Sequence, residues 1–256
     1  MQGQSEKLLY DVPVDGAYEY RLLSDSLVPL KNPCGENIRE DGSEGCELAD
    51  SGMTRAEWIK YNVLRRAVDG KTTLVPAFCE AYINAAKKRG AEAEVIAVHA
   101  AKGATQLDYW MEGTAANRLL LLKSVKAAEA AGNVRHRFFV WLQGESDAIA
   151  AVKKDEYKAM LSRFGLSLEK ALGIERFGII RVGRYTDDDR DLEIIAAQDE
   201  ICREDEFFVM LTDKAADFTT LDEYKPMLNP RAHGHYSALG LCRLGELAGT
   251  ELAEYI

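Results

Sequence analysis

The stretch RFFVWLQGESD, residues 137–147, decides the fold of this chain. Its apolar run is continuous rather than alternating, and it is rich in aromatic residues. That composition is typical of a parallel strand that helices cover on both faces. Polar residues follow the run at once, and the carboxyl ends of such strands are where α/β proteins bind their ligands. The stretch therefore predicts a buried central strand that ends at a functional edge.

Three further runs have the same character, and segments with helical period lie between them. The expected strands are residues 95–100, 137–142, 176–182 and 207–211. The expected helices are residues 54–68, 75–90, 114–132, 153–173, 191–204 and 237–256. Because strands and helices alternate, we expect a three-layer, doubly wound α/β fold with a central parallel sheet and right-handed crossovers.

The length of 256 residues suits one large domain, and we expect a single domain over residues 1–256. Residues 11–52 interrupt the alternating pattern, because they are rich in Gly, Pro, Asn and acidic residues. We predict that they form a long surface loop, and such loops often have a function.

Charge and cysteine content exclude several classes of protein. The formal net charge of −10 argues against nucleic acid and membrane surfaces as partners. Five cysteines without a short repeated spacing argue against a disulfide framework or a zinc module. Cys34 and Cys46 flank a loop and would be able to pair in an exported protein. Free thiols in a cytoplasmic protein are the favoured interpretation.

Polar clusters follow three of the expected strands, at residues 101–110, 143–147 and 212–220. Carboxyl ends of parallel strands meet at one edge, so we expect these clusters to lie close together. Residues 3–7, GQSEK, would join them if the two residues ahead of them end a further strand. We therefore expect about five or more apolar residues ahead of Gly3, or else a sheet with an unfilled slot.

Ser5 is a candidate nucleophile, and it needs a base because a free hydroxyl reacts poorly at neutral pH. His99 lies within an expected strand and is interpreted as a core or edge residue. His136 lies among arginines before a strand and is expected at the surface. His233 and His235 lie on the loop before the last helix, so one of these two is the expected base.

Two groups are candidate donors to the oxyanion that forms when an ester carbonyl is attacked. Gly103 offers a backbone N–H from a loop that a side chain would obstruct, and Gln143 offers a side-chain amide. No metal is expected, because His233 and His235 with Asp213 or Asp217 lack a third ligand at a suitable spacing. The set is thus a nucleophile, a base and two donors.

Six blocks across nearly the whole chain occur in the order of one known superfamily. They are GQS at 3–5, VPAFCEAY at 75–82, AAKGATQLDYW at 100–110, WLQGESD at 141–147, AAQ at 196–198 and HYSALGLCRLG at 235–245. WLQGESD is the most specific of them, whereas GQS alone means little. With these blocks the sequence resembles the SGNH hydrolases, which have a flavodoxin-like fold. It resembles most the carbohydrate-esterase branch that includes sialate O-acetylesterase and acetylxylan esterase domains.

The resemblance implies roles for the residues at matched positions. It makes Ser5 the nucleophile and assigns the oxyanion hole to the N–H groups of Ser5 and Gly103 and to Gln143. It makes His235 the general base, because the two glycines that follow it fall where the family has them. Glu145 is expected to orient its neighbours by hydrogen bonds.

Further residues of the matched blocks, Gln4 and Thr105, are expected to contact the substrate or support the catalytic groups. Trp110 and the 11–52 stretch are expected to form walls for a sugar, because aromatic faces stack on sugar C–H groups.

The chain departs from the family pattern at three places. Glu6 stands where the family has Asn, Ala232 stands where it has an acid, and the strand ahead of GQS is absent. We expect the partner of the His235 imidazole to be a backbone carbonyl of its own loop, Asp213 or Asp217. An orienting acid is only one way to fix a tautomer, so the reaction does not depend on that position.

The expected function is that of a serine esterase that removes acetyl groups from a carbohydrate without a cofactor. Its expected partner is the acetylated carbohydrate itself, such as an acetylated sialic acid or xylan. The alternative is a carbohydrate-binding domain that kept the fold and lost the chemistry, which the missing strand and Ala232 would explain.

Overall fold

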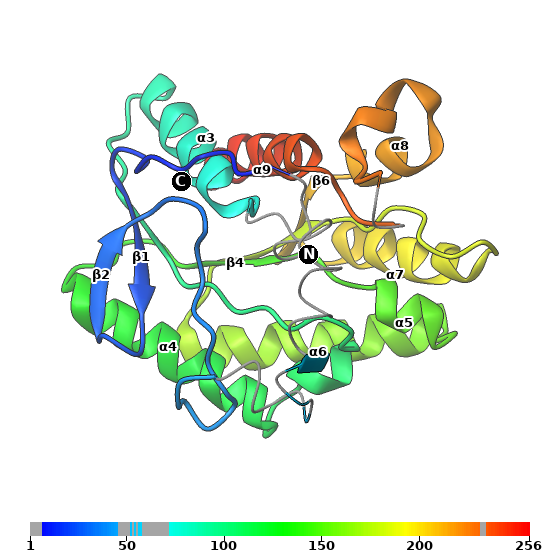
Figure 1. Ribbon diagram of the computed structural model, residues 1–256, viewed down its shortest axis with the longest axis horizontal. Helices are drawn as coiled ribbons and strands as arrows, with labels where there is room; N and C mark the ends of the chain where they lie inside the picture. Colours follow the sequence, from blue (N-terminus) through cyan, green and yellow to red (C-terminus); the bar gives the residue numbers. More distant parts are fainter. Residues whose placement is uncertain (1–6, 46–51, 53, 55, 58–71, 231–233) are drawn as a thin grey trace.

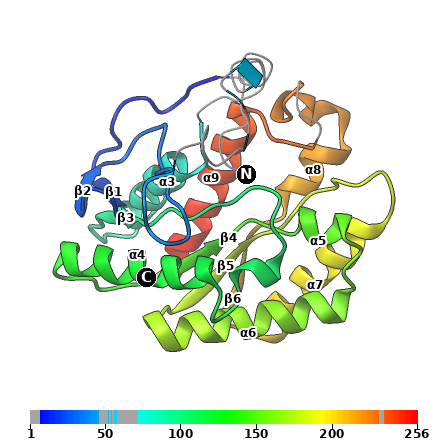
Figure 2. The ribbon, with the colours of Figure 1, turned by 60° about the horizontal axis from the view of Figure 1, so that its bottom comes forward.

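Figure 1 shows the computed structural model of the chain, which describes residues 7–45, 52, 54, 56–57, 72–230 and 234–256. Parallel strands lie between two layers of helices, so the architecture is the expected three-layer α/β fold (Figures 1 and 2). The strands are β1 Ala17–Arg21, β2 Ser26–Pro29, β3 Val95–Ala97, β4 Phe138–Trp141, β5 Arg176–Ile180 and β6 Phe208–Thr212. The helices are α3 Val75–Lys88, α4 Ala115–Ala131, α5 Glu145–Ile149, α6 Lys154–Leu172, α7 Arg190–Glu204, α8 Lys214–Thr220 and α9 Ala238–Leu252, with short 3-10 turns at Leu107–Trp110, Asp222–Met227 and Ala253–Tyr255.

One sheet consists of β4, β5 and β6 in chain order, with every pair parallel. Right-handed crossovers in this order place the connecting helices α6 and α7 on the same face of the sheet. Side chains of α4, α6 and α7 form one apolar core with that face. All four strands predicted from apolar runs are confirmed, with ends that differ by at most three residues.

The opposite face is covered by α3 and α9, which Figure 2 shows above the strands. Gly245 and Gly249 allow the two helices to lie in close contact, because a Cβ at either position would collide with a backbone carbonyl of Leu74 or Phe78. The predicted helices from residue 75 onward are confirmed, and the one predicted at 54–68 lies largely outside the described residues.

The prediction of an unbroken surface loop over residues 11–52 is wrong, because this stretch contains β1 and β2. They form an antiparallel hairpin, and β1 also pairs in parallel with β3. Ala17 and Tyr20 are buried, and the buried carboxylate of Glu19 is paired with Arg21 at 3.3 Å. The two strands of the hairpin were missed in the sequence because they are short and lie among glycine, proline and acidic residues.

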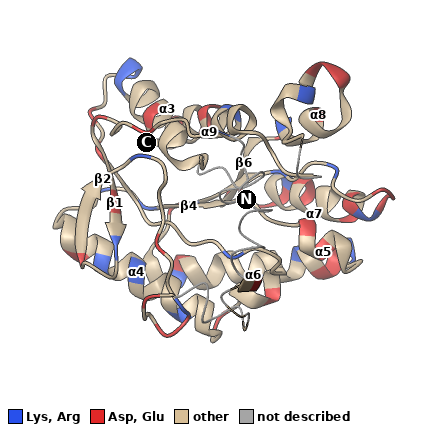
Figure 3. Ribbon diagram, in the orientation of Figure 1, with Lys and Arg blue, Asp and Glu red and all other residues tan. Residues whose placement is uncertain are grey.

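β4 carries no charged side chain, whereas β1 carries Glu19 and Arg21 (Figure 3). Acidic residues occur on α5, α7 and α8, which lie on one side of the molecule (Figure 3). No helix in the described part of the chain has the length and apolar character needed to cross a bilayer.

Candidate active site

A cavity of about 2140 Å³ lies between β3 and β4 and reaches the loops at their carboxyl ends. Gly103, Gln143 and His235 line this cavity from three separate segments of the chain. Gly103 follows β3, Gln143 follows β4, and His235 precedes α9. Ser5 and Gln4 lie outside the described residues.

Gln143 is the centre of a hydrogen-bond network at the end of β4. Its Nε2 donates to the Thr105 carbonyl oxygen at 3.1 Å and to a carboxylate oxygen of Asp147. Its Oε1 accepts from the Tyr157 hydroxyl at 3.1 Å. The Gln198 amide donates to the Gln143 backbone carbonyl at 2.8 Å. These contacts fix both the orientation of the Gln143 amide and the end of the strand.

The network changes the role expected of Gln143. A side-chain amide has two N–H donors, and the Thr105 carbonyl and Asp147 occupy both of them. Gln143 reaches an oxyanion only if one of these bonds is exchanged, and the neutral Thr105 carbonyl is the weaker partner. In this arrangement the amide holds the loop after β3 against the end of β4.

Asp147, in the first turn of α5, holds the same loop at a second point. Its buried carboxylate accepts a hydrogen bond from the Leu107 backbone N–H at 3.1 Å. Burial raises the pKa of Asp147, and the hydrogen bond from Gln143 opposes that shift. Because a buried carboxylate is costly without donors, the loop and the network are expected to fold as one unit.

Gly144 allows the chain to turn between this network and α5. Its φ is 149°, and a Cβ there would lie 2.6 Å from Ile194 Cγ2, so no larger residue fits. The turn leaves both of its neighbours, Gln143 and Glu145, on the wall of the cavity. The Oε1 atom of Glu145 is buried without a hydrogen-bond partner in the described part of the chain. Glu145 therefore supplies an acceptor in the wall beside Gln143.

Gly103 lies on an exposed loop, and its backbone N–H has no hydrogen-bond partner among the described residues. A Cβ at this position would meet nothing within 4 Å. The expectation that a side chain would obstruct the loop is therefore not supported. The next residue, Ala104, has a φ of 58°, a left-handed conformation that is unfavourable for alanine.

Trp110 is one of the residues that line the cavity, although most of its side chain is buried. It is only 7% exposed, and its ring packs edge-on against Trp141 with ring centroids 6.2 Å apart. Its Nε1 donates to the Thr105 hydroxyl at 3.2 Å. Trp110 therefore supports the loop that carries Gly103 and Thr105.

His235 is fixed at the cavity wall by its backbone and by a neighbouring ring. Its carbonyl accepts from the Asn229 N–H at 2.8 Å, and the next residue forms a β-bridge with Leu228. The Tyr185 and His235 rings meet edge to face, with centroids 6.2 Å apart. Gly234 adopts a left-handed conformation with φ of 72°, and the Tyr185 ring fills the space that a Cβ would take.

Tyr185 is held in turn by Asp191, a buried carboxylate at the start of α7. Asp191 accepts from the Tyr185 backbone N–H at 3.1 Å and from the Arg184 guanidinium at 3.2 Å. Burial and the negative charge of Glu145 raise the pKa of Tyr185. Glu145, Tyr185 and His235 thus form one wall of the cavity.

Of the two other histidines, His136 lies at the surface as expected, whereas His99 lies beyond the end of β3 rather than within a strand. His99, just after β3, is partly buried, and its Nδ1 lies 3.7 Å from Cys34 Sγ. His136 is exposed and lies 3.0 Å from a Glu175 carboxylate oxygen. Cys34 is a free thiol, and Cys46 lies outside the described residues.

The two aspartates suggested as partners of the base each face a cation. Asp217 lies 2.7 Å from Lys214 Nζ, and Asp213 lies 3.9 Å from the Arg181 guanidinium. Within the described residues, no group of three or more His, Cys, Asp or Glu is placed to hold a metal ion.

Three polar residues of this site were not found from the sequence. Tyr157 was part of a helical pattern, and nothing in that pattern distinguishes a buried hydroxyl from a core aromatic ring. Tyr185 followed a strand without any motif around it. Asp191 was expected at the start of the helix at 191–204, where acidic residues are common, so nothing indicated that its carboxylate is buried.

Comparisons with known proteins identify the family and a shared fold. A family model for carbohydrate esterases that are sialic acid-specific acetylesterases matches residues 67–246. The chain has no match among curated protein sequences. A protein of Arabidopsis thaliana, known from an X-ray structure, shares the fold with a TM-score of 0.62 and 16% identity over 96% of this chain and 84% of that one. Because the family match covers well over half of its length, the chain belongs to the carbohydrate esterase family of the sialic acid-specific acetylesterases.

Proposed function

We propose that this protein is a serine esterase that removes O-acetyl groups from a carbohydrate, with acetylated sialic acid as the first candidate substrate. One observation carries the proposal: Gly103, Gln143 and His235 line one cavity in a chain that belongs to a carbohydrate esterase family. Acyl transfer to a serine requires a base and donors to the oxyanion. The imidazole of His235 is the base, and the Gly103 N–H and the Gln143 amide are the donors.

The reaction has two steps through an acetyl-enzyme. His235 takes the proton of the Ser5 hydroxyl as its oxygen bonds to the acetyl carbonyl carbon. The bond between that carbon and the sugar oxygen breaks, and the imidazolium returns the proton to the sugar hydroxyl. Water, deprotonated by the same imidazole, then attacks the acetyl carbon. The bond from that carbon to the Ser5 oxygen breaks, the imidazolium returns its proton to Ser5, and acetate leaves.

The negative charge on the carbonyl oxygen requires donors that are already oriented. The Gly103 N–H is available for this purpose, because it has no partner among the described residues. The second donor is the Gln143 Nε2, which exchanges its bond to the Thr105 carbonyl for a bond to the oxyanion. Asp147 keeps the amide in place during this exchange, since it holds the other N–H.

A second candidate function is carbohydrate binding without hydrolysis. The observation in its favour is that both Gln143 donors are already engaged. Release of acetate separates the two functions, because a binding domain retains the acetylated sugar unchanged.

The test measures acetate released from 4-nitrophenyl acetate, 9-O-acetylated sialic acid and acetylated xylan. Ser5→Ala should lower kcat on the order of 10⁶-fold, as loss of a nucleophilic serine does. Gln143→Ala should lower kcat by about 10²–10³-fold, the effect of one lost oxyanion donor. A change in KM alone for Gln143→Ala would contradict its role as a donor.

Two matched pairs provide the controls. His235→Ala should be far more damaging than His233→Ala, and the reverse order would show that His233 is the base. Ser24→Ala removes an exposed hairpin hydroxyl and should leave turnover unchanged. Full activity of Ser5→Ala would overturn the proposed mechanism, and intact acetyl esters with every substrate would favour the binding domain.

A further inference from the structure

The two ends of the Gln143 amide differ in what they offer an oxyanion. Its Nε2 donates to Asp147 and, at 3.1 Å, to the carbonyl of Thr105, a residue of the cavity wall. Its Oε1 lies on the other side, 3.1 Å from the Tyr157 hydroxyl. An amide rotated by half a turn would place an oxygen where the donor is needed, and an oxygen without a proton repels an oxyanion. The role of Gln143 therefore depends on what prevents that rotation.

Gln198, on α7, begins a chain of hydrogen bonds whose direction is set by a backbone group. The Val182 N–H, which can only donate, bonds to the Gln198 Oε1 at 3.0 Å. The Gln198 Nε2 therefore faces the opposite way. It donates to the Gln143 backbone carbonyl at 2.8 Å and to the Tyr157 hydroxyl oxygen at 3.2 Å. These two bonds use both N–H groups of the Gln198 amide.

Tyr157, on α6, connects Gln198 to the Gln143 side chain. Its hydroxyl oxygen accepts from Gln198 and, at 3.4 Å, from the Trp141 indole N–H. Its single proton has two acceptors within reach in the described part of the chain, the backbone carbonyl and the Oε1 of Gln143, each at 3.1 Å. The carbonyl already accepts from Gln198, whereas Oε1 has no second donor among the described residues. The proton is therefore assigned to Oε1.

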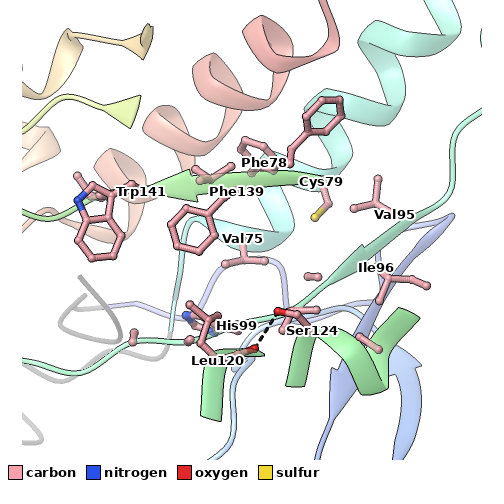
Figure 4. Close-up of a pocket in the computed structure, with 18 of the residues that line it drawn as sticks. Val75, Phe78, Cys79, Val95, Ile96, His99, Leu120, Ser124, Phe139 and Trp141 are labelled. Carbon is pink, nitrogen blue, oxygen red and sulfur yellow. Dashed lines mark hydrogen bonds between the residues drawn. The ribbon is translucent and has the colours of Figure 1, made fainter. Parts of the chain in front are cut away.

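Burial keeps this arrangement in one orientation. The Tyr157 and Gln198 side chains are fully buried, so water does not compete for their hydrogen bonds. Trp141, at the end of β4, is held by Phe139, whose ring stacks on it with centroids 6.0 Å apart (Figure 4). A rotated Gln143 amide would bring Oε1 against the Asp147 carboxylate and leave the Tyr157 proton facing an N–H group. Both ends of the amide thus favour the same orientation.

We propose that Tyr157 and Gln198 are positioning residues, which keep the donor end of the Gln143 amide turned toward the loop that carries Gly103 and Thr105. The inference rests on the proposed function and deepens it, because it concerns the donor to the oxyanion. When Nε2 exchanges its bond to the Thr105 carbonyl for a bond to the oxyanion, Oε1 remains bonded to the Tyr157 hydroxyl. The amide then needs no reorientation as the negative charge develops.

Asp147 does not replace these two residues. It accepts from Nε2 as a carboxylate, but a protonated acid bonds equally well to either end of an amide. Burial raises the pKa of Asp147, so part of its population is protonated at a higher pH than for an ordinary aspartate. The Tyr157 hydroxyl keeps its proton at neutral pH, because burial raises its pKa as well.

The first test measures hydrolysis of 4-nitrophenyl acetate by Tyr157→Phe, which removes only the hydroxyl. Its kcat should fall by about 10–100-fold, a part of the ~10²–10³-fold loss of a whole oxyanion donor. Its KM should change by less than about twofold, because the interaction forms only in the transition state. Gln198→Leu should show the same division between kcat and KM.

A double variant separates positioning from a general loss of structure. In a Gln143→Ala background, Tyr157→Phe should lower kcat by less than about twofold, because no amide is left to orient. Tyr20→Phe is the matched control, since it removes another fully buried hydroxyl, which is bonded to Asp25 in the hairpin of β1 and β2. It should lower the unfolding temperature without changing kcat. Equal losses from Tyr157→Phe with and without Gln143 would overturn the proposal.

A second readout does not require turnover. The Gln143 side-chain N–H signals in a ¹⁵N–¹H spectrum are those that Gln143→Ala removes. Tyr157→Phe should raise their exchange with solvent at least about tenfold, and Tyr20→Phe should leave it unchanged. A chain that hydrolyses no acetyl ester would refute the proposed function, and the exchange rates would then decide the orientation of the amide. Unchanged exchange in Tyr157→Phe, or an unchanged kcat in an active enzyme, would overturn the inference.

Discussion

β5 and β3 have similar apolar side chains but different surroundings. Residues Phe177–Ile180 of β5 are buried, and β4 and β6 are hydrogen-bonded to the two edges of that strand. All three residues of β3 are partly exposed, and among the described strands β1 alone is hydrogen-bonded to it. The side chains do not account for the difference, so it lies in the number of neighbouring strands.

The comparison shows what a continuous apolar run predicts. Such a run is typical of a strand with helices on both faces and strands on both edges. β5 has all four neighbours, whereas β3 and β4 each lack one edge partner in the described part of the chain. Among the described strands, β5 therefore fits this rule on both edges, and β3 and β4 fit it on one edge each.

The largest loss of stability should come from removing an aromatic ring in the sheet of β4, β5 and β6. Phe177→Ala should lower the free energy of unfolding by about 3–5 kcal/mol, because the ring is fully buried among other aromatic rings. Ile96→Ala in β3 should cost less than about 2 kcal/mol, since its side chain is partly exposed. Urea unfolding of both variants measures the difference, and equal costs would contradict the comparison.

A buried ion pair should make a large contribution to the stability of the sheet of β1, β2 and β3. Lys123, on α4, lies 3.3 Å from a Glu36 carboxylate oxygen, and its ammonium also donates to the His99 carbonyl at 3.0 Å. Lys123→Met should cost about 3 kcal/mol, because it leaves a buried carboxylate without its cation. Lys126→Met removes an exposed pair on the same helix and should have no measurable effect in urea unfolding. Comparable losses in the two variants would show that the buried pair has no special importance.

A smaller effect should appear as a pH dependence of the free energy of unfolding, caused by His99 at the end of β3. Burial and the nearby Lys123 lower the pKa of His99 to about 4, below its ordinary value of 6.5. The unfolded chain therefore binds the proton first, and stability should fall as the pH drops from about 6.5 toward 4. His99→Gln should flatten this part of the curve of unfolding free energy against pH. An unchanged slope in that variant would assign the dependence to other groups.

Much of the fold was predictable because its strands and helices have clear periods. The runs at 137–142, 176–182 and 207–211 became β4, β5 and β6, and polar residues follow each of them. The hairpin of β1 and β2 was missed, since its strands are only five and four residues long. Its buried Glu19 is an exception to the rule that acidic residues lie at the surface.

The site was less predictable than the fold, because its polar contacts join distant segments. Motif spacing drew attention to Gln143 and His235, and both line the cavity. It did not reveal that the Gln143 amide already donates hydrogen bonds to Asp147 and to the Thr105 carbonyl. It also did not reveal that Trp110 is mostly buried and packs against Trp141.

The most direct test of the proposed function is covalent labelling by a serine-directed fluorophosphonate, mapped by peptide mass spectrometry. The account predicts one adduct per folded chain, on Ser5, at a rate that His235→Ala lowers strongly and His233→Ala does not. An adduct on another serine, or a folded chain that hydrolyses acetyl esters and takes no label at Ser5, would contradict it.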